Sequence, residues 1–137
     1  MFIIGNKLHR KVNSEMNREI KFRAWQKNYK KMADVVGIRF GLNFIDISMV
    51  GFNYAFGIDE VELMQYTGLL DKNGKEIYEG DIIESQYFLP SEVMFVNGCF
   101  LACDISFPDA ESGDYEDIEW KVIGNIYENP NLLEVNK

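Results

Sequence analysis

The chain has 137 residues, of which 47% are hydrophobic and 14% aromatic, and its formal net charge is −8 at pH 7. This length suits one compact domain with a substantial apolar core, and the composition excludes global disorder. Apolar runs such as Ile45 to Val50 are far shorter than the roughly 20 residues that span a bilayer. We therefore expect no transmembrane helix and no membrane partner.

Residues 1–15 differ in character from the rest of the chain. Their apolar stretch, Phe2 to Ile4, precedes the basic stretch Lys7 to Lys11, which reverses the order found in a secretory signal. We expect residues 1–15 to be a non-native or disordered extension, with Met16 as the biological start. An ordered N-terminal arm is the alternative.

A cluster of basic and aromatic residues follows this extension. Apolar and polar residues alternate from Glu19 to Trp25, which predicts a strand, and Gln26 to Lys31 predicts a polar turn. Basic residues with interleaved aromatics are typical of a surface that holds single-stranded nucleic acid by charge and stacking. The alternative is a strand that turns one face to the core. The candidate nucleic-acid-binding residues are Arg18, Lys21, Arg23, Trp25, Lys27, Tyr29, Lys30 and Lys31.

Further strands are expected in the central part of the chain. The apolar, glycine-punctuated run from Met32 to Val50 predicts one or two strands, and Glu62 to Tyr66 predicts another. A turn from Asp71 to Gly74 comes next, because Asn73 and Gly74 tolerate the positive φ angles of tight turns.

A second reversal leads into the strands of the C-terminal half. Ile77 and Tyr78 are apolar anchors, Glu79-Gly80 makes the reversal, and a strand is expected to begin at Asp81. Asn97-Gly98 between apolar runs predicts a hairpin, and residues 108–117 form an acidic loop. The remaining expected strands are Ile82 to Leu89, Val93 to Val96, Cys99 to Phe107 and Ile118 to Ile123.

The two cysteines are expected on one strand. At about 3.3 Å per residue, Cys99 and Cys103 lie about 13 Å apart, beyond the roughly 7 Å Cα limit for a disulfide. We expect both to be reduced, buried and apolar, as in a reducing compartment.

The chain ends in a predicted helical turn. A residue before proline is pushed away from helical dihedrals, so Asn129 should be extended or turn-like, and Pro130 then opens a short turn that carries Leu132 and Leu133. There is no long helical period and no internal repeat. Short strands at fairly regular spacing predict an all-β fold, either a barrel or a sandwich.

Four segments together match one known family. They are Arg18-Glu-Ile-Lys-Phe-Arg-Ala-Trp25, Met64-Gln-Tyr-Thr-Gly68, Asp71 to Ile82 and Val122 to Pro130. With these segments the chain closely resembles the YopX family of small proteins encoded by bacteriophages and prophages, whereas residues 32–61 share no motif with it. The family-signature residues, expected to be structural, are Tyr66, Gly68, Asn73, Gly74, Ile77, Tyr78, Gly80, Asp81, Gly124, Asn125, Tyr127 and Pro130.

The resemblance implies a single YopX-like β domain over residues 16–137. Residues 16–66 would form an N-terminal β part and residues 67–137 an SH3-like barrel part. It also implies a location in the cytoplasm of a bacterial host, but it does not by itself point to any catalytic activity.

The sequence offers little for catalysis or for a cofactor. The one histidine, His9, lies in the extension, and two cysteines with one histidine cannot assemble an ordinary zinc site. Carboxylates gather from Glu76 to Glu84, which suits acid–base work or a hard cation. In an EF-hand loop beginning at Asp71, however, Glu76 would stand where the glycine is needed. We favour a solvated charged turn, and we expect no catalytic residue, no metal and no cofactor.

Charge is distributed unevenly along the chain. Residues 16–75 carry nine Lys or Arg against seven Asp or Glu, whereas residues 76–137 carry two against fourteen. The excess of negative charge disfavours binding along a nucleic-acid backbone. It suits solubility or a basic partner.

Three classes of function remain. The first is a non-enzymatic protein-interaction module of a phage or prophage, which includes binding to further copies of itself. Ten Phe, seven Tyr and two Trp exceed what one hairpin core can hide, and aromatics are enriched at interface hot spots. The second is a nucleic-acid binder that uses the face from Arg18 to Lys31. An enzyme ranks third.

Overall fold

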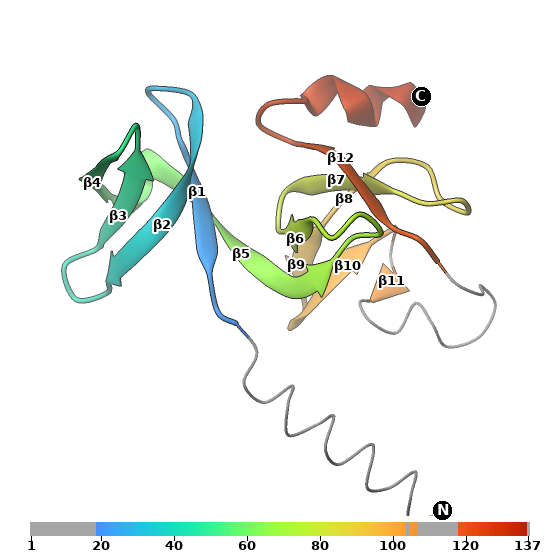
Figure 1. Cartoon of the computed structure of the whole chain (residues 1–137), viewed down its shortest axis with the longest axis horizontal. Coiled ribbons are helices and arrows are strands. Elements are labelled where there is room, and N and C mark those ends of the chain that lie inside the picture. Colours follow the sequence, from blue (N-terminus) through green and yellow to red (C-terminus); the bar gives the residue numbers. More distant parts are fainter. Residues whose placement is uncertain (1–18, 104, 107–117, 137) are drawn as a thin grey trace, which may run out of the picture.

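The computed structural model describes residues 19–103, 105–106 and 118–136, and within them the regular elements are strands and short 3-10 helices (Figure 1). The all-β prediction is therefore confirmed. The strands are β1 Phe22–Gln26, β2 Lys31–Arg39, β3 Phe44–Met49, β4 Phe52–Gly57, β5 Val61–Leu70, β6 Glu76–Tyr78, β7 Asp81–Glu84, β8 Ser91–Glu92, β9 Met94–Val96, β10 Cys99–Ala102, β11 Ile105–Ser106 and β12 Lys121–Asn125. The 3-10 helices are η1 Ile58–Glu60 and η3 Pro130–Asn136.

Several expectations lie outside the described residues. They concern the extension at residues 1–15, Met16, Arg18 and the acidic loop at residues 108–117. Within the described ranges, no helix is long and apolar enough to cross a membrane.

The N-terminal half consists of β1 to β5, which belong to an antiparallel sheet in the order β4-β3-β2-β1-β5-β6, and the last strand of this sheet, β6, lies in the C-terminal half. Small residues lie at its centre, where Ala24 of β1 is fully buried and stands opposite Ala33 of β2 on one side and Leu63 of β5 on the other. Ile45, Ile47 and other apolar side chains of the same face complete this core. The alternation of buried and exposed residues along β3 is the period of two that a strand with one buried face requires.

The C-terminal half consists of two three-stranded sheets, β12-β7-β8 and β11-β10-β9, beside β6. They enclose a second core that includes Ile83, Val93 and Trp120, and Phe88 stacks on Trp120 with ring centroids 5.7 Å apart. An SH3-like barrel is not confirmed, because the ladders of the described strands do not join into one closed barrel. β5 connects the halves, since it pairs with β1 in one and with β6 in the other.

Two of the expected strands end earlier than predicted. The run expected from Ile82 to Leu89 stops at Glu84, because the Ser85 hydroxyl accepts hydrogen bonds from the backbone N–H groups of Tyr87 and Phe88 and forms a turn. The run expected from Cys99 to Phe107 is broken by Cys103, whose φ is +56°, and β11 folds back on β10. The two cysteines therefore do not share a strand. Both are free, as predicted, but both are half-buried where full burial was expected.

Two other features were missed. Gln26, expected in a polar turn, ends β1 and is fully buried, and its Oε1 accepts a hydrogen bond of 2.7 Å from the N–H of Tyr29. Strand β4 was not predicted. It forms one edge of the large sheet, and the two-residue turn Val50-Gly51 joins it to β3. Strands β2 to β4 make up one end of the molecule, away from the C-terminal half (Figure 1).

Candidate functional site

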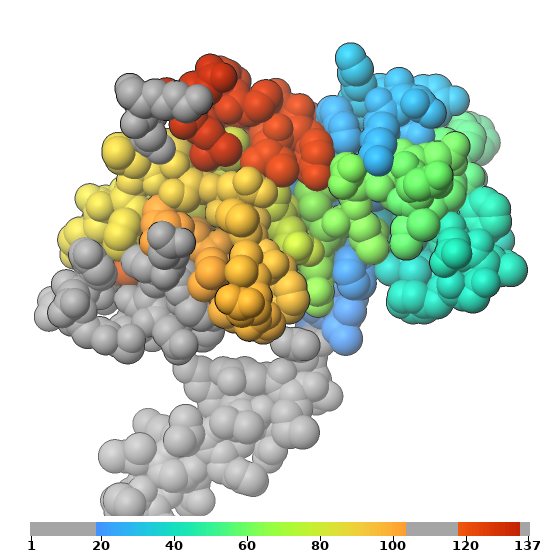
Figure 2. Space-filling model, turned by 180° about the vertical axis from the view of Figure 1, so that it is seen from behind, coloured from blue at the N-terminus to red at the C-terminus, as the bar shows by residue number. Residues whose placement is uncertain are grey.

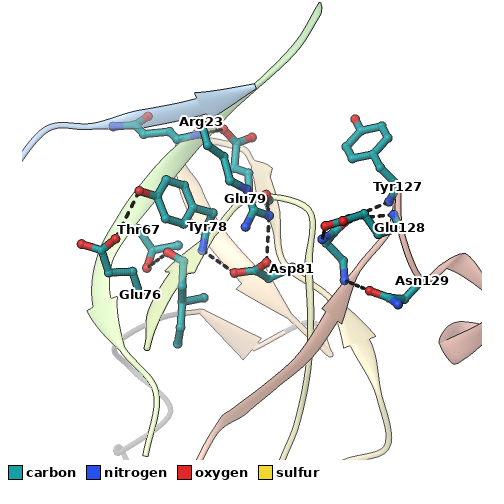
Figure 3. Close-up of polar contacts among 12 residues, drawn as sticks. Arg23, Thr67, Glu76, Tyr78, Glu79, Asp81, Tyr127, Glu128 and Asn129 are labelled. Carbon is teal, nitrogen blue, oxygen red and sulfur yellow. Dashed lines mark hydrogen bonds and ion pairs between the residues drawn. The ribbon is translucent and has the colours of Figure 1, made fainter. Parts of the chain in front are cut away.

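The segments that carry the sequence motifs meet where the two halves join, at a place we call the junction. Figure 3 shows four of its residues, which are Arg23 of β1, Tyr78 and Asp81 at the β6–β7 turn, and Tyr127 after β12. The fifth is Trp25 of β1, which contacts Tyr127. Arg23 Nη2 lies 2.8 Å from Asp81 Oδ1 and also donates to the carbonyl of Glu79 at 3.2 Å. Its guanidinium stands 4.7 Å from the centre of the Tyr78 ring. The junction thus holds an ion pair and a cation–π contact between residues that are 55 or more positions apart in the sequence.

The ion pair is almost withdrawn from water. The Arg23 and Asp81 side chains are 12% and 2% exposed. The second carboxylate oxygen of Asp81 accepts from the N–H of Tyr78 at 2.8 Å. Burial raises the pKa of Asp81, while the charge and hydrogen bond of Arg23 and the N–H of Tyr78 act to lower it. Such a pair adds little net stability, but the loss of either partner leaves an uncompensated buried charge.

The β6–β7 turn is tied to β5. The Glu79 carboxylate accepts from the N–H of Gln65 at 2.9 Å, and the N–H of Glu79 donates to the carbonyl of Gln65 at 2.9 Å. Gly80 has a φ of +82°, and a Cβ atom there would lie 3.0 Å from the sulfur of Met64. The positive φ therefore favours glycine at this position, and a side chain would in addition have to displace Met64 slightly.

The segment after β12 places Tyr127 against Trp25. The side-chain oxygen of Asn125 accepts from the N–H groups of Tyr127 and Glu128 at 3.0 and 2.9 Å, which forms an Asx turn. The rings of Trp25 and Tyr127 then stack, with centroids 5.6 Å apart and an angle of 15° between their planes. In Figure 2 the C-terminal segment, in red, accordingly lies beside the blue β1–β2 segment.

Asp71 makes a second polar anchor inside the C-terminal half. One carboxylate oxygen accepts from the N–H groups of Asn73 and Lys75 at 2.8 and 2.9 Å, and the other accepts from the N–H of Val122 in β12 at 2.9 Å. Burial alone would raise the pKa of Asp71, but these three donors outweigh it and lower the pKa. The side chain therefore closes its own turn and joins that turn to β12.

Three of the four carboxylates from Glu76 to Glu84 are bonded within the protein, and Asp81 is 1% exposed, so the expected solvated charged turn is wrong. Glu76 pairs with Lys21 and accepts from the Tyr78 hydroxyl at 3.3 Å. Burial, followed by the charge of Glu76, raises the pKa of Tyr78 to about 12. Within the described residues, no group of three or more His, Cys, Asp or Glu could hold a metal ion. What the junction can do, on this geometry, is hold the two halves together.

A sequence model of the family described as "YopX protein" matches residues 21–134. The chain belongs to the YopX family. No curated protein matches it. Among solved structures, it is similar to the crystal structure of protein EF1440 from Enterococcus faecalis, with 31% sequence identity and a TM-score of 0.57, over 84% of this chain and 98% of that one.

The family-signature residues of this YopX chain lie in or beside the junction and the Asp71 turn. Tyr66 and Tyr78 are neighbours, with ring centroids 5.4 Å apart, and Ile77 belongs to the C-terminal core. Gly124 has no room for a side chain, because a Cβ atom would lie 2.5 Å from Asn129 Oδ1. Gly68 lies where the pairing of β5 with β6 is irregular, and Asn73 and Gly74 lie in the Asp71 turn. Pro130 begins η3. The remaining signature residues, described above, are Gly80, Asp81, Asn125 and Tyr127.

The predicted nucleic-acid-binding residues do not form one face. Of the described members, Arg23 and Trp25 point into the junction, Lys21 pairs with Glu76, and Lys27 pairs with Glu62 at 3.2 Å. Tyr29, Lys30 and Lys31 are exposed around the β1–β2 turn. Ion pairing thus leaves two exposed lysines for phosphate contacts, and nucleic-acid binding stays a prediction with reduced support.

A hollow of about 440 Å³ opens on the C-terminal half. Its walls are mostly apolar, with Met94, Leu101 and Leu133 among them, and it also contains Glu92 and the thiol of Cys103. Burial raises the pKa of Glu92. Among the residues that line it there is no histidine to activate the thiol.

The β2–β4 end presents a different kind of surface, which the sequence motifs did not indicate. Apolar side chains exposed on this end are Val36, Phe40, Leu42, Phe44, Val50, Phe52 and Tyr54, with Ile58 just beyond β4. Strand β4 pairs only with β3 among the described strands, so its other side is open. We call residues Phe52–Gly57 the β4 edge.

Proposed function

We propose that this YopX-family chain is a non-enzymatic protein-interaction module of phage or prophage origin, acting in the bacterial cytoplasm, whose partner adds a strand to the β4 edge. One observation carries the proposal. The β4 edge is a six-residue strand with no charged residue and no proline, and four of its residues are exposed. Its unpaired backbone groups form a ready template for another strand.

Soluble proteins usually protect such an edge. The common devices are a charged side chain, a proline, a bulge or a covering loop, because an open, apolar edge promotes aggregation. In the described residues the β3–β4 pairing runs from Phe44↔Gly57 to Met49↔Phe52 without a bulge. An edge kept apolar and regular is the arrangement that proteins use for recognition by strand addition, where backbone hydrogen bonds provide affinity and alternate side chains provide specificity.

The junction supports the non-enzymatic part of the proposal. Arg23, Asp81, Glu76 and Asp71 are the polar groups in which chemistry would be sought, and each is hydrogen-bonded or ion-paired to another group of the same chain. Their geometry fixes the scaffold and leaves the exposed surfaces for binding.

Site-specific photo-crosslinking tests the proposal. The chain is expressed in bacteria with p-benzoylphenylalanine in place of Phe52, and separately in place of Leu89, which is 67% exposed on the other half of the molecule. Discrete adducts are expected from position 52 and not from position 89. In the purified complex, hydrogen exchange should slow at those amides of the β4 edge that do not bond to β3.

The proposal is wrong if position 52 yields no adduct, or if both positions yield the same set. Adducts without slower exchange in β4 would also contradict it, because contact alone does not require strand addition.

A further inference from the structure

The aromatic residues of the β4 edge share one face of the sheet. Phe52, Tyr54 and Phe56 lie opposite Met49, Ile47 and Ile45, and the two isoleucines are fully buried in the N-terminal core. Phe52 and Tyr54 nevertheless remain 68% and 44% exposed, because none of the described strands follows β4 in the sheet. The core face therefore continues past the last strand as an uncovered aromatic row.

The charge around this row favours a second copy of the chain. The whole chain carries a net charge of −8, so two copies repel one another on average. From Lys31 to Gly57 there are two basic and two acidic residues, which give no net charge, and Arg39 and Asp46 of this set pair with each other at 2.6 Å. This neutral end is where two copies can approach with the least repulsion.

We infer that the strand added at the β4 edge is β4 of a second copy, antiparallel and related by a twofold axis at Tyr54. The inference rests on the proposed function and names its partner. Directly opposed residues of an antiparallel pair point to the same face, so the twofold axis must lie between a residue and its own copy, which then stand opposite one another.

Of the possible axes, only the one at Tyr54 pairs all three aromatics. It sets Tyr54 opposite its own copy and Phe52 opposite Phe56 of the partner. An axis at Ala55 would leave Phe52 outside the ladder, and an axis at Asn53 would leave Phe56 outside it. Val50 and Ile58, which are 85% and 50% exposed just beyond the strand ends, would flank the pair and extend its apolar contact.

Charge reversal at the twofold axis tests this arrangement. The wild-type chain should be a dimer by light scattering or sedimentation in the micromolar range. Tyr54→Lys and Tyr54→Glu should each become monomeric, with the dissociation constant raised about 100-fold or more, because each change places two like charges in contact. An equal mixture of the two variants should dimerise again, since opposite charges then meet. Leu89→Lys, a matched exposed apolar site, should dimerise like wild type.

A disulfide gives a second measurement that does not depend on charge. In a background with Cys99→Ser and Cys103→Ser, Tyr54→Cys should form a disulfide-linked dimer on mild oxidation, because opposed Cα atoms lie about 4.5 to 5.5 Å apart. Asn53→Cys, which would lie opposite Ala55 of the partner, should not form one.

A monomeric wild-type chain, a failure of the two variants to recover the dimer on mixing, or equal oxidation at positions 53 and 54 would overturn the inference. If the wild-type chain is monomeric but position 52 crosslinks to a different protein, the inference fails while the proposed function stands. If position 52 crosslinks to nothing, both fail.

Discussion

The junction and the β2–β4 end use aromatic and charged residues in opposite ways. At the junction, Trp25 and Tyr78 are covered, and the charges of Arg23 and Asp81 satisfy one another. At the β2–β4 end, Phe52 and Tyr54 are left exposed beside a strand with an open side. The sequence segments that carried the resemblance to the YopX family lie in the first region, whereas the β4 edge lies in residues 32–61, where no such segment was identified although the family model spans residues 21–134. The motifs therefore report on how the chain holds its shape, and the surface available for binding lies in the region without them.

The largest effect is expected from breaking the junction. Replacing Arg23 by alanine leaves the Asp81 carboxylate, which is 2% exposed, without its counter-charge. We expect the free energy of unfolding in urea to fall by about 3 to 5 kcal/mol, as is typical when one partner of a buried ion pair is removed.

A surface pair at the β2–β4 end provides the control. Arg39 and Asp46 are 46% and 27% exposed, so Arg39→Ala should cost less than about 1 kcal/mol. Combining Arg23→Met with Asp81→Asn should recover part of the loss, because no charge is then left buried and the asparagine oxygen still accepts from Tyr78. If Arg23→Ala and Arg39→Ala lower the free energy of unfolding by the same amount, the ion pair at the junction is no more important for stability than one at the surface.

A smaller effect is expected at the Asp71 turn, and it should depend on pH. Asparagine keeps one acceptor oxygen and loses the other, so Asp71→Asn should destabilise the protein by about 1 to 3 kcal/mol at pH 7. The folded-state pKa of Asp71 is lowered from its ordinary value of 3.8, so the ionised group stabilises the fold above that value. This contribution is lost as the pH falls through the lower pKa of the folded state.

The measurement is urea unfolding of wild type and variant from pH 7 to pH 2.5. The difference in unfolding free energy between wild type and Asp71→Asn should be largest at neutral pH and should become smaller in acid. Asp34→Asn, at an exposed carboxylate of β2, should show a small difference across the whole range. A gap between wild type and Asp71→Asn that stays constant into acid would mean that the three backbone donors do not favour the ionised form.

How much of this could be predicted from the sequence depended on the range of each interaction. Local signals were sufficient for the Asn97-Gly98 hairpin, the Asp71 turn and the helical turn at Pro130. The junction was not predicted, because Arg23 and Asp81 are 58 residues apart and the pattern along one strand does not reveal which distant residue it will meet. The β4 edge was missed although its sequence carries a local signal, since the aromatics at positions 52, 54 and 56 alternate with Asn53 and Ala55 in the period of two that a strand requires.

The smallest effect expected is a gain in stability, and it compares two turns of the same shape. Val50-Gly51 and Asn97-Gly98 each join adjacent strands by two residues, with φ angles of +49° and +81° in the first and +51° and +82° in the second. Asparagine suits the first position of such a turn, whereas a β-branched residue is strained there. We expect Val50→Asn to stabilise the monomer by about 1 kcal/mol in dilute thermal or urea unfolding, and Asn97→Val to destabilise it by a similar amount.

If Val50→Asn leaves stability unchanged while Asn97→Val lowers it, the strain at Val50 is offset by contacts of its side chain. If both changes behave as expected, the strained apolar valine at the tip of the β4 hairpin is retained at a cost in stability, which is the pattern of a residue kept for binding.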